Sequence, residues 1–465
     1  MGRGRGRAAA LAPLLSAALG AALACGGAAG EAETVVRFWG LGREGEVVRE
    51  LVPEFERRHP GIRVEVQQIP WTAAHEKLLT AFVGRSTPDA AQLGNTWVPE
   101  LMALGALAPL DSAVAASEAI DREDYFAGVW DTNVVDGEVW GLPWYVDTRL
   151  LFYRTDLVAG GPWPPRSWAE WREAMERIRD TGGPDRHAIL LPIDEWPQPV
   201  ILALQLGAPL VSEGGREGDF QEPRFRRAMA FYTGLFADGL AAPLDQAAVA
   251  NLYQSFAEGG FAMMITGPWN LGELERRLPA EMQDRWGTVP LPPPEAGMEY
   301  PGASLAGGSS LVVFKDSPAP EAAWRWLEYL SEPAQQARFL ELTGDLPARR
   351  SVWESAGLAG DPRTAAFMAQ LEHAVPTPKV PEWERIATRI AQAGEQVARG
   401  ARSLDAALAA LDADVDRILE KRRWMLDRVA EREGEQRPEP DERDAEEDPA
   451  PRAREAGRAA GGEAR

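Results

Sequence analysis

The chain has 465 residues, with 71 Asp and Glu against 49 Lys and Arg for a formal net charge of −22, and 45% of its residues are hydrophobic. At about 150 residues per domain this length predicts two or three domains. The hydrophobic fraction is enough for each domain to bury a core, so the chain is not disordered throughout. The acidic balance disfavours nucleic acid, which proteins hold mainly through Lys and Arg. A single Cys allows neither an internal disulfide nor a thiolate zinc site. Trp is abundant, with 17 residues against seven Tyr.

Residues 1–24 are predicted to be a secretory signal peptide. Three Arg precede an apolar run over 8–23, and Ala22-Leu23-Ala24 supplies small residues at a cleavage site. Cys25 follows directly and resembles the lipidation site of bacterial lipoproteins, although Leu23 stands two residues before it instead of the usual three. Ordinary cleavage after Ala24, which would release a soluble secreted protein, is the alternative. Residues 25–33 are expected to be a linker.

The other end of the chain is also unlike a folded domain. Residues 428–465 are nearly all Glu, Asp, Arg, Pro, Gly and Ala, with no aromatic residue. We expect a disordered charged tail, because little in it can be buried. The folded unit is therefore predicted to span 34–427.

Strands and helices alternate from the start of this unit. Residues 35–39 form an apolar strand, 44–58 carry a helical apolar face, and 62–67 alternate as a second strand, which together predict a βαβ unit. A helix over 73–83, a strand over 89–93 and a helix over 97–104 follow. The unit thus begins with a parallel sheet.

The later segments continue this pattern. Residues 141–154 form an extended aromatic run, and Ser167 and Glu170 form a capping box that opens a helix to Arg179. Strands are predicted over 261–266 and 310–314, a helix over 320–331, and helical structure from 388 to about 432. The predicted class is α/β with a late helical segment.

Catalytic, metal and cofactor signatures are not found. His75-Glu76 begins an HExxH zinc motif, but Leu79 stands where the second His is needed. No Ser-His-Asp arrangement is supported, and the glycine-rich piece over 302–310 lacks the Lys of a phosphate-binding loop. We therefore predict no metal, no cofactor and no catalytic residue. Acid pairs suited to glycoside hydrolysis stay open, because their spacing is spatial.

Polar residues stand beside Trp at the ends of the predicted strands. These clusters lie at 94–97, 144–149, 194–197 and 267–270. Ligands of open α/β sheets bind beyond the carboxyl ends of strands. An indole offers a flat apolar face to the C–H groups of a sugar ring, and polar neighbours can pair with its hydroxyls. The clusters therefore favour a neutral polyol.

The chain resembles the extracellular solute-binding proteins of bacterial ABC transporters, in the carbohydrate-binding group that includes maltose-binding proteins. The resemblance covers about 35–421 and rests on the order of several segments: LVPEFERRHPGIRVEV, TPDAAQLGNTWVPELMALGALAPLD, GEVWGLPWYVDTRLLFYRTDL, FAEGGFAMMITGPWNL and GGSSLVVFKDSPAPEAAWRWLEYL. It implies the two-lobed clamshell of the type II periplasmic-binding-protein fold. It also implies a periplasmic or lipid-anchored location at the cell surface, a monomer, and docking onto a membrane permease.

By this resemblance, lobe 1 holds 34–143 and 303–350, and lobe 2 holds 144–302 and 351–427. The residues that it places in the cleft between the lobes are Trp39, Asn95, Trp97, Trp144, Tyr145, Asp147, Glu195, Trp196, Trp269, Gly307, Gly308 and Arg349.

The expected function is capture of a di- or oligosaccharide, since three or more Trp exceed what one sugar ring can cover, and its delivery to the permease without chemistry. Two alternatives stay open: an exported polysaccharide-processing enzyme, and a binding protein for a non-sugar solute such as a metal, an amino acid or an oligopeptide.

Overall fold

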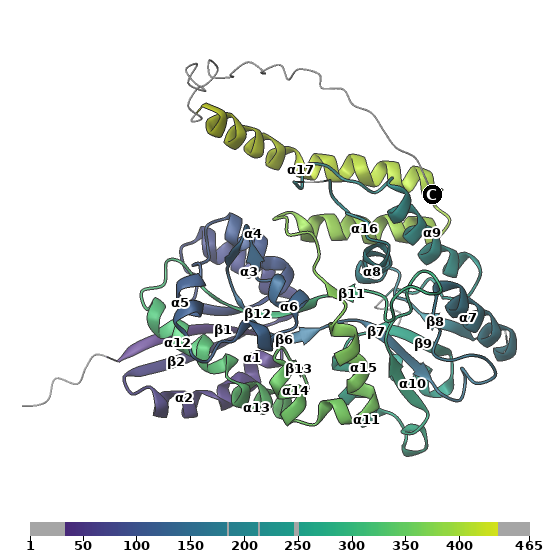
Figure 1. Cartoon of the computed structure of the whole chain (residues 1–465), viewed down its shortest axis with the longest axis horizontal. Helices are drawn as coiled ribbons and strands as arrows, with labels where there is room; N and C mark the ends of the chain where they lie inside the picture. The colour runs from purple at the N-terminus through teal and green to yellow at the C-terminus, as the bar shows by residue number, and fades with distance from the viewer. Residues whose placement is uncertain (1–32, 184–185, 213, 246–250, 436–465) are drawn as a thin grey trace, which may run out of the picture.

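The structure is a computed structural model that describes residues 33–183, 186–212, 214–245 and 251–435. It places them in two lobes, each built around a β-sheet with helices on both of its faces (Figure 1). The α/β class and the two-lobed architecture expected from the sequence are confirmed. The signal peptide, Cys25 and almost all of the linker lie outside the described residues.

Lobe 1 contains a six-stranded sheet in the order β13-β6-β12-β3-β1-β2. Its strands are β1 (Thr34–Leu41), β2 (Ile62–Ile69), β3 (Ala90–Gly94), β6 (Leu142–Asp147), β12 (Gly307–Val313) and β13 (Leu346–Pro347). β1 is parallel to β2 and β3, as the βαβ prediction requires, and β12 runs antiparallel between β3 and β6. The carboxyl ends of β3 and β6 and the start of β12 therefore meet at one edge.

Helices cover both faces of this sheet. They are α1 (Glu44–Val47), α2 (Val52–Arg58), α3 (Trp71–Val83), α4 (Val98–Ala103), α5 (Asp111–Ala116), α6 (Ala127–Asp131), α12 (Pro320–Ser331), α13 (Pro333–Thr343) and α14 (Arg350–Ser355). α12 packs on β1, β6 and β12, while Leu78 of α3 and Leu101 of α4 are buried against β3 on the other face. A short hairpin of β4 (Val134–Val135) and β5 (Glu138–Val139) completes the lobe.

The helix expected over 44–58 is interrupted. α1 and α2 are separated by a 3-10 turn over Val48–Glu50, and Pro53 stands in the first turn of α2. Proline lacks an amide hydrogen and its ring collides with the carbonyl four residues earlier, so the first helix cannot continue through it.

Lobe 2 contains a four-stranded sheet in the order β10-β7-β9-β8. Its strands are β7 (Leu150–Arg154), β8 (His187–Leu190), β9 (Phe261–Thr266) and β10 (Trp286–Val289). Its helices are α7 (Trp168–Gly182), α8 (Pro197–Gln205), α9 (Pro223–Ala237), α10 (Leu252–Glu258), α11 (Trp269–Arg277), α15 (Pro362–Leu371), α16 (Trp383–Ala398) and α17 (Leu404–Glu435). α7, α8, α9, α16 and α17 share one apolar core with β8 and β9.

The predicted cap of α7 forms with one change. The Ser167 hydroxyl accepts a hydrogen bond from the Glu170 amide at 3.2 Å. The Glu170 carboxylate accepts from the amide of Arg166 at 2.8 Å, one residue earlier than a capping box requires.

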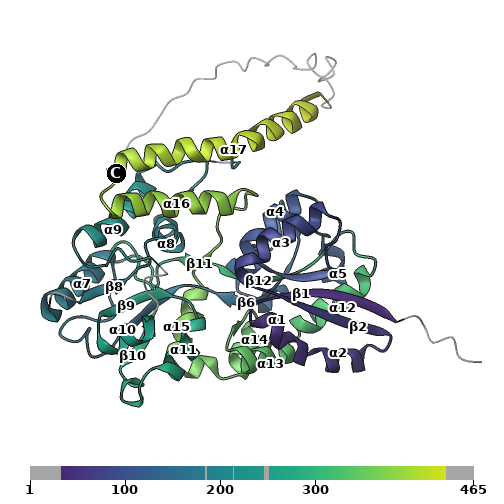
Figure 2. The same cartoon turned by 180° about the vertical axis from the view of Figure 1, so that it is seen from behind.

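The predicted late helical segment is a pair of helices. α16 and α17 pack side by side, and Gly400 between them adopts a left-handed φ of 69°, a conformation in which glycine ends helices at low cost (Figures 1 and 2). Ser403 then accepts a hydrogen bond from the Ala406 amide at the start of α17.

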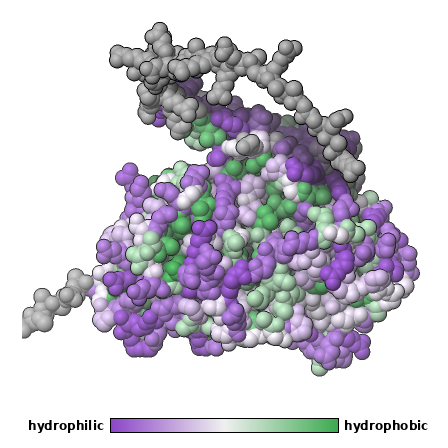
Figure 3. Space-filling view, viewed as in Figure 1, coloured by the Kyte–Doolittle hydropathy of each residue, from purple (hydrophilic) through white to green (hydrophobic). Residues whose placement is uncertain are grey.

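α17 extends past the expected start of the charged tail. The expectation of disorder from residue 428 is wrong for 428–435, because Arg, Glu and Ala favour helix and continue α17 to Glu435. The last turns of α17 expose Trp424, Met425 and Val429, and Figure 3 shows hydrophobic surface on this projecting part. Residues 436–465 lie outside the described part of the chain. Among the described helices, none is long and apolar enough to cross a membrane.

Over the described residues the chain passes between the lobes three times. Only Thr148 and Arg149 separate β6 from β7, so the first crossing lies beyond the expected boundary at 143. The second crossing, between β10 and β12, includes the expected boundary at 302, and there β11 (Ser304–Leu305) pairs in parallel with β14 (Ala374–Val375). The third lies between α14 and α15, later than the expected boundary at 350, because Trp353 of α14 packs edge-on against Phe126 in lobe 1.

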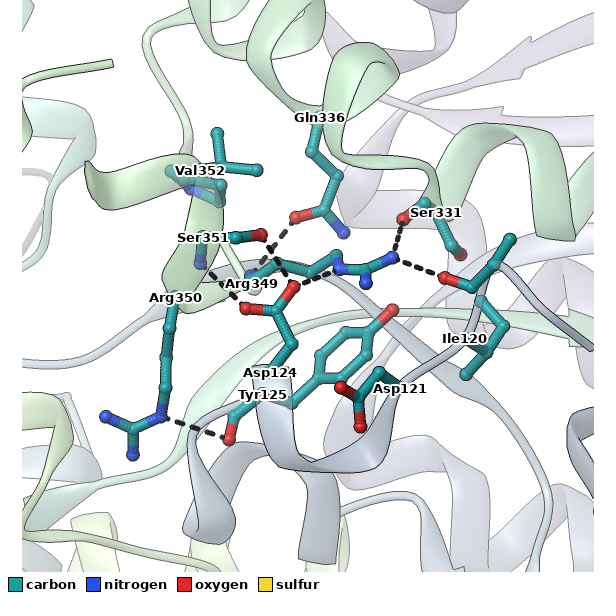
Figure 4. Close-up of polar contacts among 12 residues, drawn as sticks. Ile120, Asp121, Asp124, Tyr125, Ser331, Gln336, Arg349, Arg350, Ser351 and Val352 are labelled. Atoms are coloured by element: carbon teal, nitrogen blue, oxygen red, sulfur yellow. Dashed lines mark hydrogen bonds and ion pairs between the residues drawn. The ribbon is translucent and has the colours of Figure 1, made fainter. Parts of the chain in front are cut away.

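Arg349 joins separate segments of lobe 1 (Figure 4). Its guanidinium forms an ion pair with Asp124 at 2.6 Å and donates to the carbonyls of Ala119 and Ser331 at 2.7 and 3.0 Å. Burial opposes ionisation of Asp124, but the hydrogen bonds from Ser351 and Arg349 lower its pKa. The side chains of Arg349 and Asp124 are 6% and 14% exposed, so little water reaches the pair. Loss of Arg349 would leave the Asp124 carboxylate with its hydrogen bonds from Ser351 and without a compensating positive charge.

We expect Arg349→Met to lower the free energy of unfolding by about 3–5 kcal/mol, because removing one partner of a buried ion pair leaves the other uncompensated. Denaturant titration of the variant and the parent protein measures this. Arg338→Met is the matched control, since Arg338 and Glu341 form an exposed pair and their loss should change little. Equal stability of the two variants would contradict a stabilising role for Arg349.

Candidate functional site

A cavity of about 410 Å³, which we call the central cavity, lies between the two lobes. From lobe 1 it is lined by the predicted residues Asn95, Trp97, Tyr145, Asp147, Gly307 and Gly308. From lobe 2 it is lined by the predicted residues Trp196 and Trp269. The ends of β3, β6 and β9 thus converge on one space, as expected for ligand sites of α/β sheets.

Indole rings form much of the wall of the central cavity. Trp71 and Trp269 are 37% and 40% exposed, and Trp97 meets Trp71 edge-to-face with ring centroids 5.8 Å apart. Exposed aromatic faces of this size are costly in water unless something covers them. The cavity can therefore gain free energy by binding a ligand with an apolar face.

Trp269 is held from two sides. A Cβ atom at Gly267 would lie 1.9 Å from the Trp269 ring, so the ring lies directly over backbone that only glycine leaves open. The Arg149 guanidinium carbon lies 4.5 Å from the ring centroid, at a distance typical of a cation–π contact. The ring is thus fixed before any ligand arrives.

Two polar atoms beside this ring have no hydrogen-bond partner among the described residues. They are Oδ1 of Asp147 and Nε of Arg149, which lie 3.7 Å apart. Burial raises the pKa of Asp147, although Arg149 opposes the shift. A hydroxyl group placed between the two atoms could donate to the carboxylate and accept from the guanidinium, which would satisfy both.

A hydrogen-bond chain orients Tyr145 at the lobe 1 wall. The Leu41 amide donates to Gln92, Gln92 donates to the Tyr145 hydroxyl at 3.1 Å, and that hydroxyl donates to Glu44 at 3.3 Å. Nearby, burial and the charge of Glu44 raise the pKa of Asp345 to about 7. The carboxyl groups of Glu44 and Asp345 both line the central cavity.

One hydrogen bond crosses the central cavity from lobe to lobe. The Thr96 hydroxyl, after β3, donates to the Glu384 carboxylate, in the first turn of α16, at 2.5 Å. Burial raises the pKa of Glu384, although the hydrogen bond from Thr96 and the charge interaction with His75 act to lower it. The bond joins residues 288 positions apart in the sequence.

The glycine pair at the start of β12 allows a close approach of two strands. Gly308 has a φ of 134°, and a Cβ atom there would lie 2.3 Å from the carbonyl oxygen of Tyr145. A larger residue would separate β12 from β6 and displace Tyr145. The sequence predicts this pair at the cleft, and the structure places its backbone in the cavity wall.

Four predicted site residues lie outside the central cavity, and the expectation is corrected for them. Trp144 is 1% exposed and stacks on Phe339, because neighbouring side chains of a strand point to opposite faces and Tyr145 takes the cavity side. Trp39 packs under the Lys77 ammonium of α3. Arg349 is buried in lobe 1, where it forms its ion pair with Asp124. Glu195 lines a second cavity, described below.

Six further residues with polar or aromatic side chains, which the predicted site list omits, line the central cavity: Glu44, Trp71, Thr96, Arg149, Asp345 and Glu384. Trp71 follows the end of β2, so the strand-end pattern that identified Trp97 could have included it. Thr96 and Arg149 stand within the predicted clusters at 94–97 and 144–149, although the list of site residues omits them. Glu384 has no local signal, because only the packing of α16 against lobe 2 brings it to the cavity.

The second cavity, which we call the side chamber, lies within lobe 2 and measures about 330 Å³. Arg149 and Trp269 line both cavities, so the two adjoin. Across the described residues, no group of three or more His, Cys, Asp or Glu is arranged to hold a metal ion.

Comparison with known proteins supports this arrangement. The family model of the bacterial extracellular solute-binding proteins matches residues 39–337. The solved structure of the sugar-binding protein MalE from Xanthomonas citri is 49% identical with a TM-score of 0.81, over 85% of this chain and 99% of that one. The GacH receptor of Streptomyces glaucescens, solved unliganded and with acarbose, is 26% identical with a TM-score of 0.71, over 83% and 99%.

A Brucella abortus protein named as a binding protein is 26% identical over 411 residues, which are 86% of this chain and 96% of that protein. The family match covers more than half of the chain, and the relatives are matched over nearly their whole length. This chain belongs to the family of bacterial extracellular solute-binding proteins.

Proposed function

We propose that this protein captures a neutral di- or oligosaccharide in the central cavity and delivers it to the permease of an ABC importer. The observation that carries the proposal is that one interlobe cavity combines exposed indole faces with buried polar atoms that have no hydrogen-bond partner among the described residues. Trp269 offers an apolar face for sugar C–H groups, and Asp147 and Arg149 beside it offer an acceptor and a donor. The similarity to sugar-binding MalE and to a receptor solved with acarbose supports a sugar as the ligand.

The charge of the cavity favours a neutral ligand. Its wall carries the carboxyl groups of Glu44, Asp147, Asp345 and Glu384 against the single guanidinium of Arg149. An anionic sugar would meet net repulsion in a partly desolvated site, where charge interactions are strong.

Binding is expected to close the two lobes around the sugar without chemistry on it. A ligand shifts an equilibrium between open and closed forms by its differential affinity for them, and a sugar that touches both lobes contacts all its partners only in the closed form. The Thr96–Glu384 hydrogen bond would add to closure, because it joins the lobes at the rim of the same cavity. The permease would then recognise the closed form.

We expect the exported protein to be held at the membrane through a lipidated Cys25, as its position after the predicted signal peptide indicates. Cys25→Ser should move the protein from the detergent-extracted membrane fraction to the soluble fraction of a bacterial host. Recovery of both the parent protein and the variant in the soluble fraction would favour ordinary signal cleavage, and retention of both in the membrane fraction would contradict anchoring through Cys25.

A panel of neutral mono-, di- and oligosaccharides, with uronic acids, amino acids and peptides as comparisons, tests the ligand class by thermal shift and calorimetry. A ligand at 100 times its dissociation constant should stabilise the protein by about 2.7 kcal/mol. We expect neutral oligosaccharides to do so and uronic acids not to, and the bound sugar should be recovered intact. Stabilisation by amino acids or peptides alone would overturn the carbohydrate proposal, and turnover of the sugar would indicate an enzyme.

Trp269→Ala should weaken sugar binding about tenfold or more, because a central aromatic contact of an interface commonly contributes 2 kcal/mol or more. Calorimetric titration with the sugar found in the panel measures the change. Trp424→Ala is the matched control, since Trp424 is 59% exposed on α17, far along the chain from the cavity residues. Equal affinity of both variants would remove Trp269 from the binding site.

A further inference from the structure

We propose that the projecting end of α17 binds the surface of a membrane that contains anionic lipids, in addition to any lipid attached at Cys25. The contact surface is a row of exposed apolar and basic side chains, which we call the α17 stripe: Lys421, Trp424, Met425, Arg428, Val429 and Arg432. The proposal concerns where the protein is held and does not depend on the ligand of the central cavity.

The residues of the α17 stripe share one face of the helix. Counted from Lys421 they stand at i, i+3, i+4, i+7, i+8 and i+11, a spacing that aligns side chains along a helix. A different face is held on lobe 2, where Arg422 donates to the Gly215 carbonyl at 3.1 Å and Arg423 to the Arg216 carbonyl at 2.8 Å. The helix is thus fixed by one face while all six residues of the stripe stay exposed.

The apolar residues of the stripe are unusual for a surface helix. Trp424, Met425 and Val429 are 59%, 42% and 49% exposed. They are three of the nine exposed large hydrophobic residues among those described, so a third of these residues lie within six positions of one helix. Leu419 is the last buried side chain described on α17, and the helix continues to Glu435, projecting from lobe 2 (Figures 1 and 2). Clustered apolar surface of this kind marks a contact with a partner or a membrane.

The charged residues of the stripe are all basic, in a chain whose net charge is −22. The guanidinium carbon of Arg428 lies 5.0 Å from the centroid of the Trp424 ring, so basic and apolar groups are interleaved. The acidic residues of this part of the helix each stand one position before a basic residue of the stripe, about 100° around the helix axis, and are Glu420, Asp427 and Glu431. The stripe therefore combines apolar surface with positive charge only.

An anionic lipid surface matches both properties. Trp favours the boundary between headgroups and hydrocarbon, and Met and Val can be buried just below it. Lys and Arg extend their charged ends to the headgroups. At physiological salt, charge interactions in water are screened beyond about 8 Å, so the charges on the stripe itself decide the contact.

A second copy of this chain fits the stripe less well. A two-fold dimer places the same surface on both partners. Because the stripe holds basic residues and no acidic one, each stripe would meet the positive charges of the other, which opposes association.

Vesicle binding tests the proposal on the full chain with Cys25→Ser, so that no lipid at Cys25 contributes. We expect the protein to sediment with vesicles of phosphatidylethanolamine and phosphatidylglycerol, less so at high salt, and not with vesicles of phosphatidylcholine. The triple variant Lys421→Glu, Arg428→Glu and Arg432→Glu should weaken binding at least tenfold, because each basic side chain near an anionic surface contributes to the attraction.

The matched control makes the same change of net charge outside the stripe. Arg385→Glu, Arg389→Glu and Arg402→Glu alter three exposed positions on or next to α16. This variant should bind the phosphatidylglycerol vesicles as the parent protein does.

A second measurement locates the contact. The chain has a single Cys, so in the Cys25→Ser background one nitroxide label can be attached through Met425→Cys, in the stripe, or through Asp427→Cys, outside it. We expect phosphatidylglycerol vesicles to lower collisions of a water-soluble paramagnetic reagent with the label at 425 severalfold, and to leave those at 427 unchanged.

Several results would overturn the proposal. These are equal vesicle binding by the parent and the stripe variant, or the same change of accessibility at both labels. A dimer in analytical ultracentrifugation that the stripe variant dissociates would make a second copy the partner. If only a chain that ends at Glu435 binds vesicles, the residues after it cover the stripe in the full chain. The sugar panel needs no membrane, so none of these results decides the carbohydrate function.

Discussion

The arrangement of the site depends on one short crossing, where a single extended run leaves the sheet of lobe 1 and enters that of lobe 2. β6 ends at Asp147 and β7 begins at Leu150, so only Thr148 and Arg149 span the boundary. The Ser304 hydroxyl, on the next crossing, donates to the Arg149 carbonyl at 2.6 Å and ties two crossings together. Asp147 and Arg149 therefore line the central cavity from the crossing between the lobes.

Residues of the same type have different surroundings in this protein: some have all their hydrogen-bond partners and lie buried in the core, and others lack partners or keep exposed surface in the central cavity. Arg349 has an ion pair and two carbonyl acceptors, and it fastens lobe 1. Arg149 lies beside an exposed indole, and its Nε has no hydrogen-bond partner among the described residues. Trp144 is stacked in the core, whereas Trp269 keeps two fifths of its surface exposed. A candidate ligand site differs from a packed core in two ways. Its polar atoms lack hydrogen-bond partners, and its aromatic side chains keep exposed surface in the same cavity.

Much of this could be predicted from the sequence because it is local. Alternation and helical periodicity located the βαβ unit, and strand-end clusters identified Asn95, Trp97, Tyr145, Asp147 and Trp269, all of which line the central cavity. The resemblance placed Trp39 wrongly, and both the resemblance and the cluster at 144–149 placed Trp144 wrongly, because neither says which face of the sheet a side chain takes. Arg349 was misplaced because its partner, Asp124, lies 225 residues away and leaves no local signal.

The sequence by itself determined the α/β class, the two-lobed family fold and the aromatic character of the ligand site, since these follow from local periodicity and from the order of motifs along the chain. Only the tertiary structure decided which carboxyl groups line the central cavity, that Glu384 meets Thr96 across it, and that a second cavity adjoins it through Arg149 and Trp269. The physical reason is that hydrogen bonding and burial are settled between segments hundreds of residues apart, so the partners of a side chain, and hence its role, exist only after folding.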